Sequence, residues 1–528
     1  MRVFPALLAS LALSNAAANV PPPISDDLRG AVPAMQDTLS PAGAAPPPWI
    51  VADGNLLQRI ASQFSITTPA ATAIEQELAW FKRHPDYLDR VFSRGQPYLY
   101  YIVGELEKRG MPVELALLPI IESAFDPFAY SHGRAAGLWQ IIPGTGRRFG
   151  LEQNWWYDGR RDVIAATGAA LDYLEVLARM FDGDWLLAIA AYNSGEGNVR
   201  KAVRRNQAGG KPIDFFSIRA KLPKETRAYV PRFLALASLI REPQTHGVAL
   251  PIVSDMPVIV AAATGGQIDL ALAAELAGIE LATLHRLNPG YNRWATAPAG
   301  PHRLVVPVEA ATRFREALAT LPDNARMRWQ RHVVKSGETL SEIAERYRIS
   351  VKSLRQTNKI RGSTIRIGQA LTVPVSSQPL SSYTLTADAR QKQTQNKTRR
   401  GQRLVHVVRS GDSLWTISRQ YGVGVRELAR WNAMAPRDTL SAGRELVVWA
   451  NAAPSQAATP VAAPTEGIQE TRRIRYTVRN GDNLSVIAAR FRVRVSDLLR
   501  WNNALSTTAI LRPGQRITVY VDVAQQSS

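Results

Sequence analysis

Apolar side chains recur with helical spacing throughout the first half of the chain. Between residues 51 and 245 they stand mostly three or four positions apart, and few stretches show the alternation of a half-buried strand. The expected helices cover residues 74–82, 98–109, 113–124, 162–177, 185–192 and 225–240. This pattern predicts an all-α domain over residues 51–245, with its core from about residue 80.

The C-terminal third contains an internal repeat with three copies. In each copy an apolar segment precedes a Gly, an Asn follows that Gly by 21 positions, and a second Gly stands 31 to 33 positions after the first. These positions are Gly337, Asn358 and Gly368, then Gly411, Asn432 and Gly443, then Gly481, Asn502 and Gly514. Short apolar strands flank two helices in each copy, and Thr339, Ser413 and Asn483 are good N-caps for the first helix. Each copy therefore predicts a small α+β module of βααβ order.

The repeats define the organisation of the C-terminal part. The modules cover residues 331–375, 403–450 and 473–521. The segments between them, 376–402 and 451–472, are polar or rich in Ala, Pro and Thr, which is typical of flexible linkers.

A weaker version of the repeat lies upstream, within residues 250–325. Gly266 is followed 22 positions later by Asn288, then by Gly300 and an apolar segment at 303–306. Two interpretations fit this segment equally well: a degenerate module of the same kind, or an unrelated small α+β connector.

Charge divides the chain into two parts. Residues 328–528 contain 32 Lys and Arg against 13 Asp and Glu, so they carry nearly all of the net charge of +20. A basic region favours a polyanionic partner, either nucleic acid or an anionic cell surface. The chain has no Cys, which excludes disulfides, thiolate metal ligands and a lipid on an N-terminal Cys. Its 7 His residues are scattered, so we expect no metal and no cofactor.

The N-terminal residues decide between these partners. A basic residue, an apolar run at 3–13 and an Ala-x-Ala-type site form the pattern of a secretory signal peptide over residues 1–18. The run is too short to span a bilayer, which needs about 20 residues. Cleavage after Ala18 would leave a Pro- and Ala-rich tether at 19–50. We expect an exported, periplasmic, wall-associated protein with no transmembrane span, no lipid anchor and no nucleic-acid partner; an uncleaved N-terminal anchor is the alternative.

Glu122 is the strongest candidate for chemistry in the helical domain. It follows the apolar segment 115–121, so full hydration of its carboxylate is hard to arrange. Burial disfavours the charged form and raises the pKa, and a carboxyl group that keeps its proton near neutral pH can act as a general acid. Pro119 is expected to kink the helix one turn before Glu122 and open the backbone beside it. The competing interpretation is an ordinary solvated Glu.

Four short motifs that include Glu122 occur in a fixed order. They are Glu-Ser at 122–123, Gly-Leu-x-Gln at 137–140, Ala-Tyr-Asn at 191–193 and Glu-Thr-x-x-Tyr-Val at 225–230. Together they resemble the lytic transglycosylases of the soluble-lytic-transglycosylase type, whose catalytic domain is similar to goose-type lysozyme. The resemblance covers about residues 80–245 and implies a lysozyme-like all-α domain that cleaves the glycan strands of peptidoglycan.

The resemblance implies roles for the residues nearest to the acid. Glu122 would serve as the single general acid and base. Ser123 and Ser131 would hydrogen-bond near it or near the bound sugar. Tyr192 would hold the Glu122 carboxyl group or its proton, and Tyr229 would line the site. The plainer alternatives are that Ser123 bonds back to its own helix and that Tyr229 is a core aromatic.

Three further residues would shape the binding groove. Gln140 would contact an N-acetylated sugar, Trp139 would form part of the groove, and Asn193 would fix the loop that carries Tyr192. Alternatively, Trp139 is a core aromatic. Asn193 could likewise serve only to end its helix. Arg134 departs from the family pattern, in which a small residue is common, so one wall of the groove is expected to differ.

The βααβ modules resemble LysM modules, which bind glycans that contain N-acetylglucosamine, chiefly peptidoglycan. The resemblance implies glycan contacts from turn residues and from two repeated asparagines. These candidates are Gly337, Gly411, Asp412, Gly481, Asp482, Asn432 and Asn502. Anionic wall polymers are further partners that the positive charge favours. A helical catalytic domain followed by LysM modules resembles the lytic murein transglycosylase D family.

A single carboxylate limits the possible reactions. Most glycosidases use two carboxyl groups roughly 5 to 9.5 Å apart, and the motifs offer no second Asp or Glu at an obviously matching place beside Glu122. An internal nucleophile, the C6 hydroxyl of the muramic acid residue, would then close a 1,6-anhydro ring without consuming water. Two alternatives stay open: a hydrolysing N-acetylmuramidase with Asp126 or Asp162 as its base, and a non-catalytic peptidoglycan-binding scaffold.

Overall fold

The computed structural model describes residues 54–450, 471–478, 482–491, 493, 495–502, 511 and 514–522. The expected signal peptide, the tether at 19–50, nearly all of the expected linker at 451–472 and Gly481 lie outside the described residues. Contacts divide the chain into two units, residues 1–452 and 453–528, and each is described by itself.

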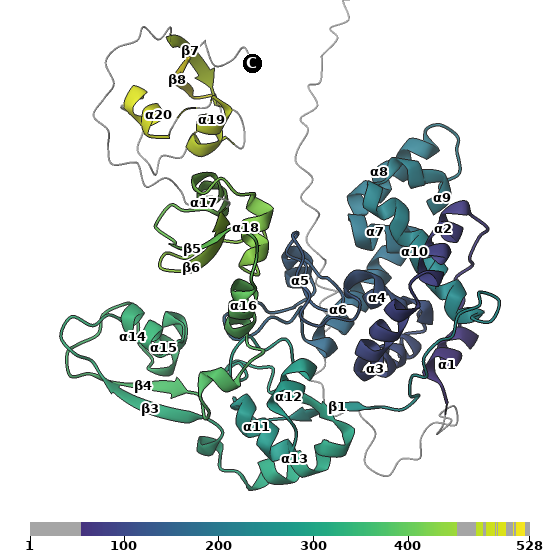
Figure 1. Ribbon diagram of the computed structural model, residues 1–528, viewed down its shortest axis with the longest axis horizontal. Helices are drawn as coiled ribbons and strands as arrows, with labels where there is room; N and C mark the ends of the chain where they lie inside the picture. The colour runs from purple at the N-terminus through teal and green to yellow at the C-terminus, as the bar shows by residue number, and fades with distance from the viewer. Residues whose placement is uncertain are drawn as a thin grey trace, which may run out of the picture. The chain divides into compact units, whose positions relative to one another are not determined.

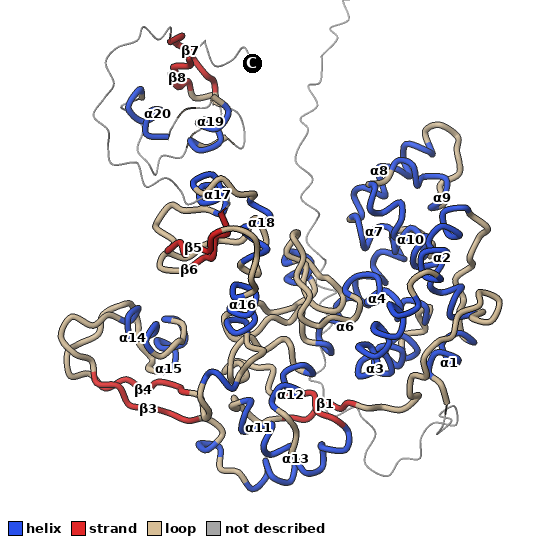
Figure 2. Tube along the Cα trace, viewed as in Figure 1, coloured by secondary structure: helices blue, strands red, loops and turns tan. Residues whose placement is uncertain are grey.

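The first part of the chain is helical, as Figure 1 and Figure 2 show. Its elements are α1 (Leu56–Ser62), α2 (Thr72–Lys82), α3 (Pro85–Lys108), the 3₁₀ turn η2 (Val113–Leu117), α4 (Leu118–Ser123), α5 (Pro143–Arg148), α6 (Val163–Met180), α7 (Trp185–Ser194), α8 (Glu196–Gln207), α9 (Phe215–Ile218), η3 (Arg219–Lys221) and α10 (Lys224–Arg241). The all-α prediction is confirmed. Asp162 caps α6 by accepting a hydrogen bond from the Ala165 N–H, and Gly195, with φ of 85°, ends α7.

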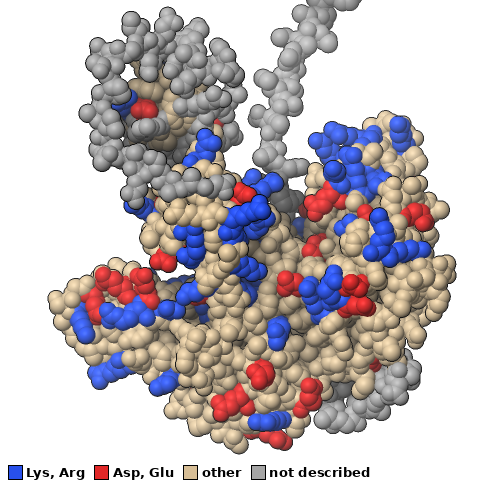
Figure 3. Space-filling view, in the orientation of Figure 1, with Lys and Arg blue, Asp and Glu red and all other residues tan. Residues whose placement is uncertain are grey.

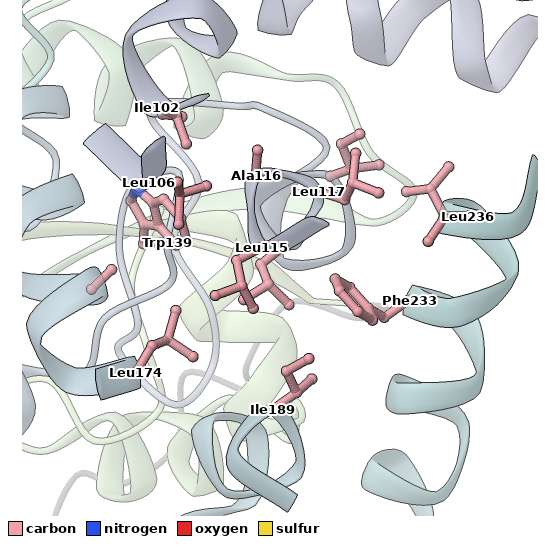
Figure 4. Close-up of a cluster of buried hydrophobic side chains, with 14 of the residues drawn as sticks. Ile102, Leu106, Leu115, Ala116, Leu117, Trp139, Leu174, Ile189, Phe233 and Leu236 are labelled. Carbon is pink, nitrogen blue, oxygen red and sulfur yellow. The ribbon is translucent and has the colours of Figure 1, made fainter. Parts of the chain in front are cut away.

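The core of this domain surrounds the segment that leads to Glu122. Large side chains from α3, α6, α7 and α10 gather against it (Figure 4), and Leu106, Leu174, Ile189 and Phe233 are completely buried. Burial of one such side chain contributes roughly 1.5–3 kcal/mol. The backbone of η2 and α4 is therefore held from several sides.

Pro119 starts a helix instead of bending one. The 3₁₀ turn η2 ends at Leu117, and α4 begins at Leu118 with Pro119 in its first turn. The first N–H groups of a helix have no partner within the helix, so Pro is tolerated there without distortion. The expected kink before Glu122 is wrong: α4 is a short separate helix that ends one residue after Glu122.

Residues 259–320 form a fourth module with the βααβ order. Its elements are β1 (Ile259–Ala263), α11 (Leu270–Ala277), α12 (Leu281–Leu287) and β2 (Arg303–Pro307), followed by α13 (Val308–Thr320) and η4 (Asp323–Ala325). Its residues Leu287 and Val305 belong to the core cluster of the helical domain. Arg303 forms a salt bridge of 2.9 Å with Asp162. The module is therefore packed directly on the helical domain.

The three repeats have the predicted βααβ order, each with a two-stranded antiparallel sheet (Figure 2). They comprise β3 (Arg328–Val333), α14 (Leu340–Arg346), α15 (Val351–Thr357) and β4 (Ala370–Val375); β5 (Gln402–Val407), α17 (Leu414–Gln420), α18 (Val425–Trp431) and β6 (Glu445–Ala450); and β7 (Thr471–Thr477), α19 (Leu484–Arg490), α20 (Val495–Trp501) and β8 (Arg516–Asp522). Thr339, Ser413 and Asn483 accept hydrogen bonds from the first turns of α14, α17 and α19, as expected for N-caps.

One Asn joins a helix to a strand in the same way in all four modules. In the second repeat, Asn432 Nδ2 donates to the carbonyls of Leu428 and Val447 at 2.8 Å each, and its Oδ1 accepts the Val447 N–H at 2.7 Å. The equivalent side chains with the same three bonds are Asn288, Asn358 and Asn502. Asn432 is 0% exposed. This geometry corrects the expectation that Asn432 contacts glycan, because its amide is buried and used within the module. The glycan contact of Asn502, which is partly exposed, stays a prediction.

The segment 376–402 is not a flexible linker. It contains η5 (Leu380–Ser382) and α16 (Ala387–Asn396). Tyr383 is buried in the core of the fourth module, where its hydroxyl donates to Asp269 at 2.8 Å. The expectation failed because contacts to residues distant in sequence, such as Tyr383 with Asp269 and Asp388 with Arg293, hold an otherwise polar segment.

Across the described part of the chain, no helix combines the length and the apolar character needed to cross a bilayer. The same residues contain no group of three or more His, Asp and Glu side chains placed to hold a metal ion.

We predict that Asn432→Ala lowers the stability of the second repeat. The Val447 N–H and the carbonyls of Leu428 and Val447 would lose their hydrogen-bond partner. The loss should be about 1–3 kcal/mol. Hydrogen exchange of the Val447 amide in the whole protein measures it. Asn396→Ala, at an exposed position, is the control and should change nothing. Unchanged protection at Val447 would show that the Asn bridge is not structural.

Candidate active site

A cleft of about 810 Å³ opens in the helical domain beside α4. Its lining comes from α4, the loop before α5, the end of α7 and the first turns of α10. Six of the eight candidates predicted in this domain line it: Glu122, Ser131, Gln140, Tyr192, Asn193 and Tyr229. The structure thus brings together motifs that lie more than 100 residues apart in sequence.

Glu122 is half-buried and held by Tyr229. The Tyr229 hydroxyl donates to Glu122 Oε1 at 2.6 Å, and no other hydrogen bond to this carboxyl group forms within the described residues. Burial raises the pKa of Glu122 to about 7, the Tyr229 hydrogen bond opposes the rise, and the charge of Glu225 adds to it. At neutral pH the group can therefore exist in both the acid and the base form.

The two cleft tyrosines differ in what their hydroxyl groups contact. The Tyr192 hydroxyl donates to the Trp139 carbonyl at 2.7 Å, whereas Tyr229 makes the contact with Glu122. Tyr229 lines the cleft and also makes the contact with the carboxyl group that was expected of Tyr192. Burial, reinforced by the nearby Glu122 charge, raises the pKa of both tyrosines well above the ordinary value. Tyr229 therefore acts as a hydrogen-bond donor and not as a base.

Two candidate site residues, Trp139 and Ser123, do not line the cleft and instead hold its loops in place. Trp139 is 0% exposed, and its Nε1 donates to Thr167 Oγ1 at 3.0 Å, so it is a core aromatic and does not line the cleft. The Ser123 hydroxyl donates to the Pro119 carbonyl at 3.1 Å and to the Leu138 carbonyl at 2.9 Å. Ser123 thus bonds back to its helix and also ties the Gly-Leu-x-Gln loop to α4.

The loop between α4 and α5 has an unusual backbone. The non-Gly residues Ala124, Phe125, Arg134 and Gln140 all have φ between 46° and 68°. Such conformations cost roughly 1–3 kcal/mol each and persist only where surrounding contacts impose them. Gly137 has φ of 76°, and a Cβ there would lie 2.2 Å from the Arg160 carbonyl oxygen, which explains the Gly of the motif.

Hydrogen bonds within this loop and behind it fix the cleft residues. Ser131 Oγ accepts the Ala135 N–H at 3.0 Å, and Gln140 Nε2 donates to the Gly137 carbonyl at 2.9 Å. Asn193 Oδ1 accepts the Thr226 hydroxyl at 2.8 Å, so it ties the end of α7 to α10. The helix that carries Tyr192 is thus joined to α10 by this bond.

The two alternative bases are engaged elsewhere. Asp126 Oδ1 accepts the Phe128 N–H at 2.9 Å and closes a turn. Asp162 caps α6, accepts the Tyr157 hydroxyl at 2.8 Å and pairs with Arg303. Neither residue lines the cleft.

Sequence reasoning missed two carboxylates that line the cleft, Glu196 and Glu225. Glu196 accepts the Tyr173 hydroxyl at 3.0 Å and lies 3.5 Å from Arg148. Glu225 is exposed at the rim. The sequence did indicate the position of Glu225. It stands four positions before Tyr229 and therefore lies on the same face of α10.

Three known protein families match parts of the chain. The transglycosylase SLT domain matches residues 100–215, the lytic transglycosylase MltD LysM-like domain matches residues 263–323, and the LysM domain matches residues 332–374, 406–449 and 476–519. The helical domain is thus a transglycosylase domain of the SLT class. The fourth module is LysM-like, which decides against an unrelated connector.

Individual relatives extend this match. Membrane-bound lytic murein transglycosylase D of Escherichia coli strain K12 is 39% identical over 406 residues, which cover 74% of this chain and 86% of the relative. A putative tributyltin chloride resistance protein of Alteromonas sp. strain M-1 is 44% identical over 167 residues, 32% of this chain and 78% of the relative. A solved structure of the lytic transglycosylase Slt of Pseudomonas aeruginosa is 29% identical, covers 29% of this chain and 25% of that chain, and has a TM-score of 0.23. The chain belongs to the lytic murein transglycosylase D family.

We predict that Tyr229→Phe raises the pKa of Glu122 further, because the lost hydrogen bond stabilised the carboxylate. Activity that needs protonated Glu122 falls as pH rises through its pKa of about 7. The alkaline midpoint of kcat/KM should therefore move up by about one pH unit in the variant. Tyr192→Phe is the control and should keep the midpoint, since its hydroxyl bonds Trp139. A midpoint that moves down in Tyr229→Phe would contradict the assignment.

Proposed function

We propose that the protein cleaves the β-1,4 bond between N-acetylmuramic acid and N-acetylglucosamine in peptidoglycan without consuming water. The product would carry a 1,6-anhydro-muramic acid end. The observation that supports this most strongly is one carboxyl group, Glu122, held in a cleft with a pKa of about 7. Such a group can give a proton in one step and take one in the next at the same pH.

In the first step, protonated Glu122 gives its proton to the oxygen that links the two sugars, and the bond from that oxygen to C1 of the muramic acid residue breaks. The acetamido group of the same sugar supports the positive charge at C1. The Tyr229 hydroxyl, 2.6 Å from Oε1, stabilises the carboxylate that Glu122 has become.

In the second step, the Glu122 carboxylate removes the proton from the C6 hydroxyl of the muramic acid residue. The C6 oxygen attacks C1 and closes the anhydro ring, and Glu122 returns to its acid form. The attack is intramolecular, so the nucleophile has a high effective concentration and no base for water is needed.

The binding roles rest on the cleft and on the LysM modules. Ser131, Gln140 and Asn193 line the cleft and would contact the glycan strand. Gly337, Gly411 and Asp412 form the turn between the first strand and first helix of their modules, and their glycan contacts stay a prediction, as do those of Gly481 and Asp482. We also infer export to the periplasm from residues 1–18.

Exposed positive charge favours anionic wall polymers as additional partners. On the face shown in Figure 3, Lys and Arg gather over α8. This helix exposes Arg200, Lys201, Arg204 and Arg205. The near-zero net charge of the first 327 residues concealed this local basic surface. Such surfaces raise the local concentration of a polyanion at low salt.

We predict that Glu122→Gln abolishes release of anhydro-muropeptides, because Gln can neither give nor take the proton, while binding to peptidoglycan is retained. Mass spectrometry of the products distinguishes anhydro ends from hydrolysed ends, which are heavier by one water. Glu225→Gln is the matched control, since Glu225 is an exposed carboxylate of the same cleft for which the described residues provide no salt bridge. It should still give anhydro products. Hydrolysed ends from the wild-type protein would refute the proposed reaction.

We predict that removal of residues 453–528, which form a separate unit, leaves the products unchanged and weakens binding to intact peptidoglycan several-fold. Added salt should weaken binding of the full chain, because ions screen its net charge of +20. Sedimentation with purified walls measures both effects, and walls stripped of anionic polymers are the control. Equal binding of the shortened protein would contradict the role of the third LysM module.

A further inference from the structure

A second cavity, distinct from the Glu122 cleft, is lined by arginines. It has a volume of about 800 Å³ and is formed by the loop 128–134, residues 158–161, α16 and the second LysM module. Six arginines line it against three aspartates. None of these arginines takes part in the proposed reaction, so their concentration in one cavity needs another explanation.

Each aspartate in the cavity already has an arginine partner. The pairs are Asp158 with Arg160 at 2.7 Å and with Arg161 at 3.0 Å, Asp438 with Arg134 at 2.9 Å, and Asp388 with Arg293. Within the described residues, Arg390 and Arg444 form no salt bridge. The cavity therefore holds positive charge that the protein itself does not neutralise.

Arg390 is the centre of this unneutralised charge. Its guanidinium lies 4.2 Å from the centre of the Phe128 ring, and among the described residues its buried Nη1 has no hydrogen-bond partner. The same part of the structure offers no partner to the buried Nε of Arg161. Burial and the charge of Arg161 lower the pKa of Arg390 to about 9. Burial likewise lowers the pKa of Arg444, whose Nη2 donates to Gln391 at 2.9 Å. An anion would pair with these donors and relieve the repulsion.

The cavity adjoins the catalytic cleft through one loop. Ser131 lines the cleft, whereas Tyr130 and Arg134 of the same loop line the arginine cavity. Arg134 therefore does not form a wall of the sugar groove. Its side chain pairs with Asp438 of the second LysM module. The Asp438 carboxylate also accepts a hydrogen bond from the Tyr130 hydroxyl at 3.0 Å. A glycan strand in the cleft would have its substituents close to the cavity.

We propose that this cavity binds the carboxylates of the stem peptide carried by muramic acid, an inference that rests on the proposed action on peptidoglycan. Guanidinium groups bind carboxylates through paired hydrogen bonds. The lining also includes the apolar side chains of Phe128 and Met434, which suit the small apolar residues of a peptide. A volume of about 800 Å³ is far larger than a single inorganic anion needs.

The kinetic test uses the full chain and two substrates: glycan strands with stem peptides, and the same strands after an amidase has removed them. Arg390→Gln and Arg444→Gln should each raise the KM for peptide-bearing strands about tenfold with little change in kcat. The KM for bare strands should not change. Arg437→Gln is the matched control, because Arg437 is an exposed residue of the same LysM loop that does not line the cavity.

A binding measurement separates a peptide from a simple anion. Calorimetry on the full-length Glu122→Gln variant should show that free stem peptide binds more strongly than inorganic phosphate. Peptide binding should be lost in the double variant that also carries Arg390→Gln. Equal binding of phosphate and peptide, equal KM changes on both substrates, or no KM change would each overturn the proposal. Anhydro products would still form in those cases, so failure of the peptide site is distinguishable from failure of the proposed reaction.

Discussion

A carboxyl group that keeps its proton near neutral pH must be shielded from water, and the helical domain is organised around this requirement. Glu122 stands at the end of a short helix whose preceding residues are fully packed. Its pKa of about 7, against an ordinary 4.5, means that ionising Glu122 in the folded protein costs about 3 kcal/mol more than ionising a hydrated Glu. The raised folded pKa makes the domain lose stability as pH rises from 4.5 to 7. The rest of the core must offset this loss.

The contacts around Glu122 divide into those that reach the carboxyl group and those that hold the loops. Tyr229 alone among the described residues bonds the carboxyl group directly. Ser123, Tyr192 and Asn193 bind backbone or the neighbouring helix and keep the strained loop in place. This division explains why motif residues can be essential to the geometry of a site without touching the reacting atoms.

The amino-acid sequence was informative where a signal is local and periodic. Helical spacing, N-caps such as Thr339 and the repeat of Gly and Asn predicted the domain classes, and the apolar segment before Glu122 indicated the candidate acid. Contacts between distant segments could not be predicted: the burial of Trp139 depends on Thr167, and the anchoring of Tyr383 depends on Asp269. The sequence also could not show that Tyr229, and not Tyr192, contacts Glu122, because this depends on how distant helices pack together.

Burial gives the Glu122 carboxyl group a pKa near neutrality, so that it can act as an acid and then as a base. The most direct measurement is an NMR titration of ¹³C-labelled Glu carboxyl groups in the full chain, with Glu122→Gln used to identify the signal that disappears. We expect a midpoint near pH 7 for that signal. A midpoint near the ordinary value of a hydrated Glu, about 4.3, would contradict it.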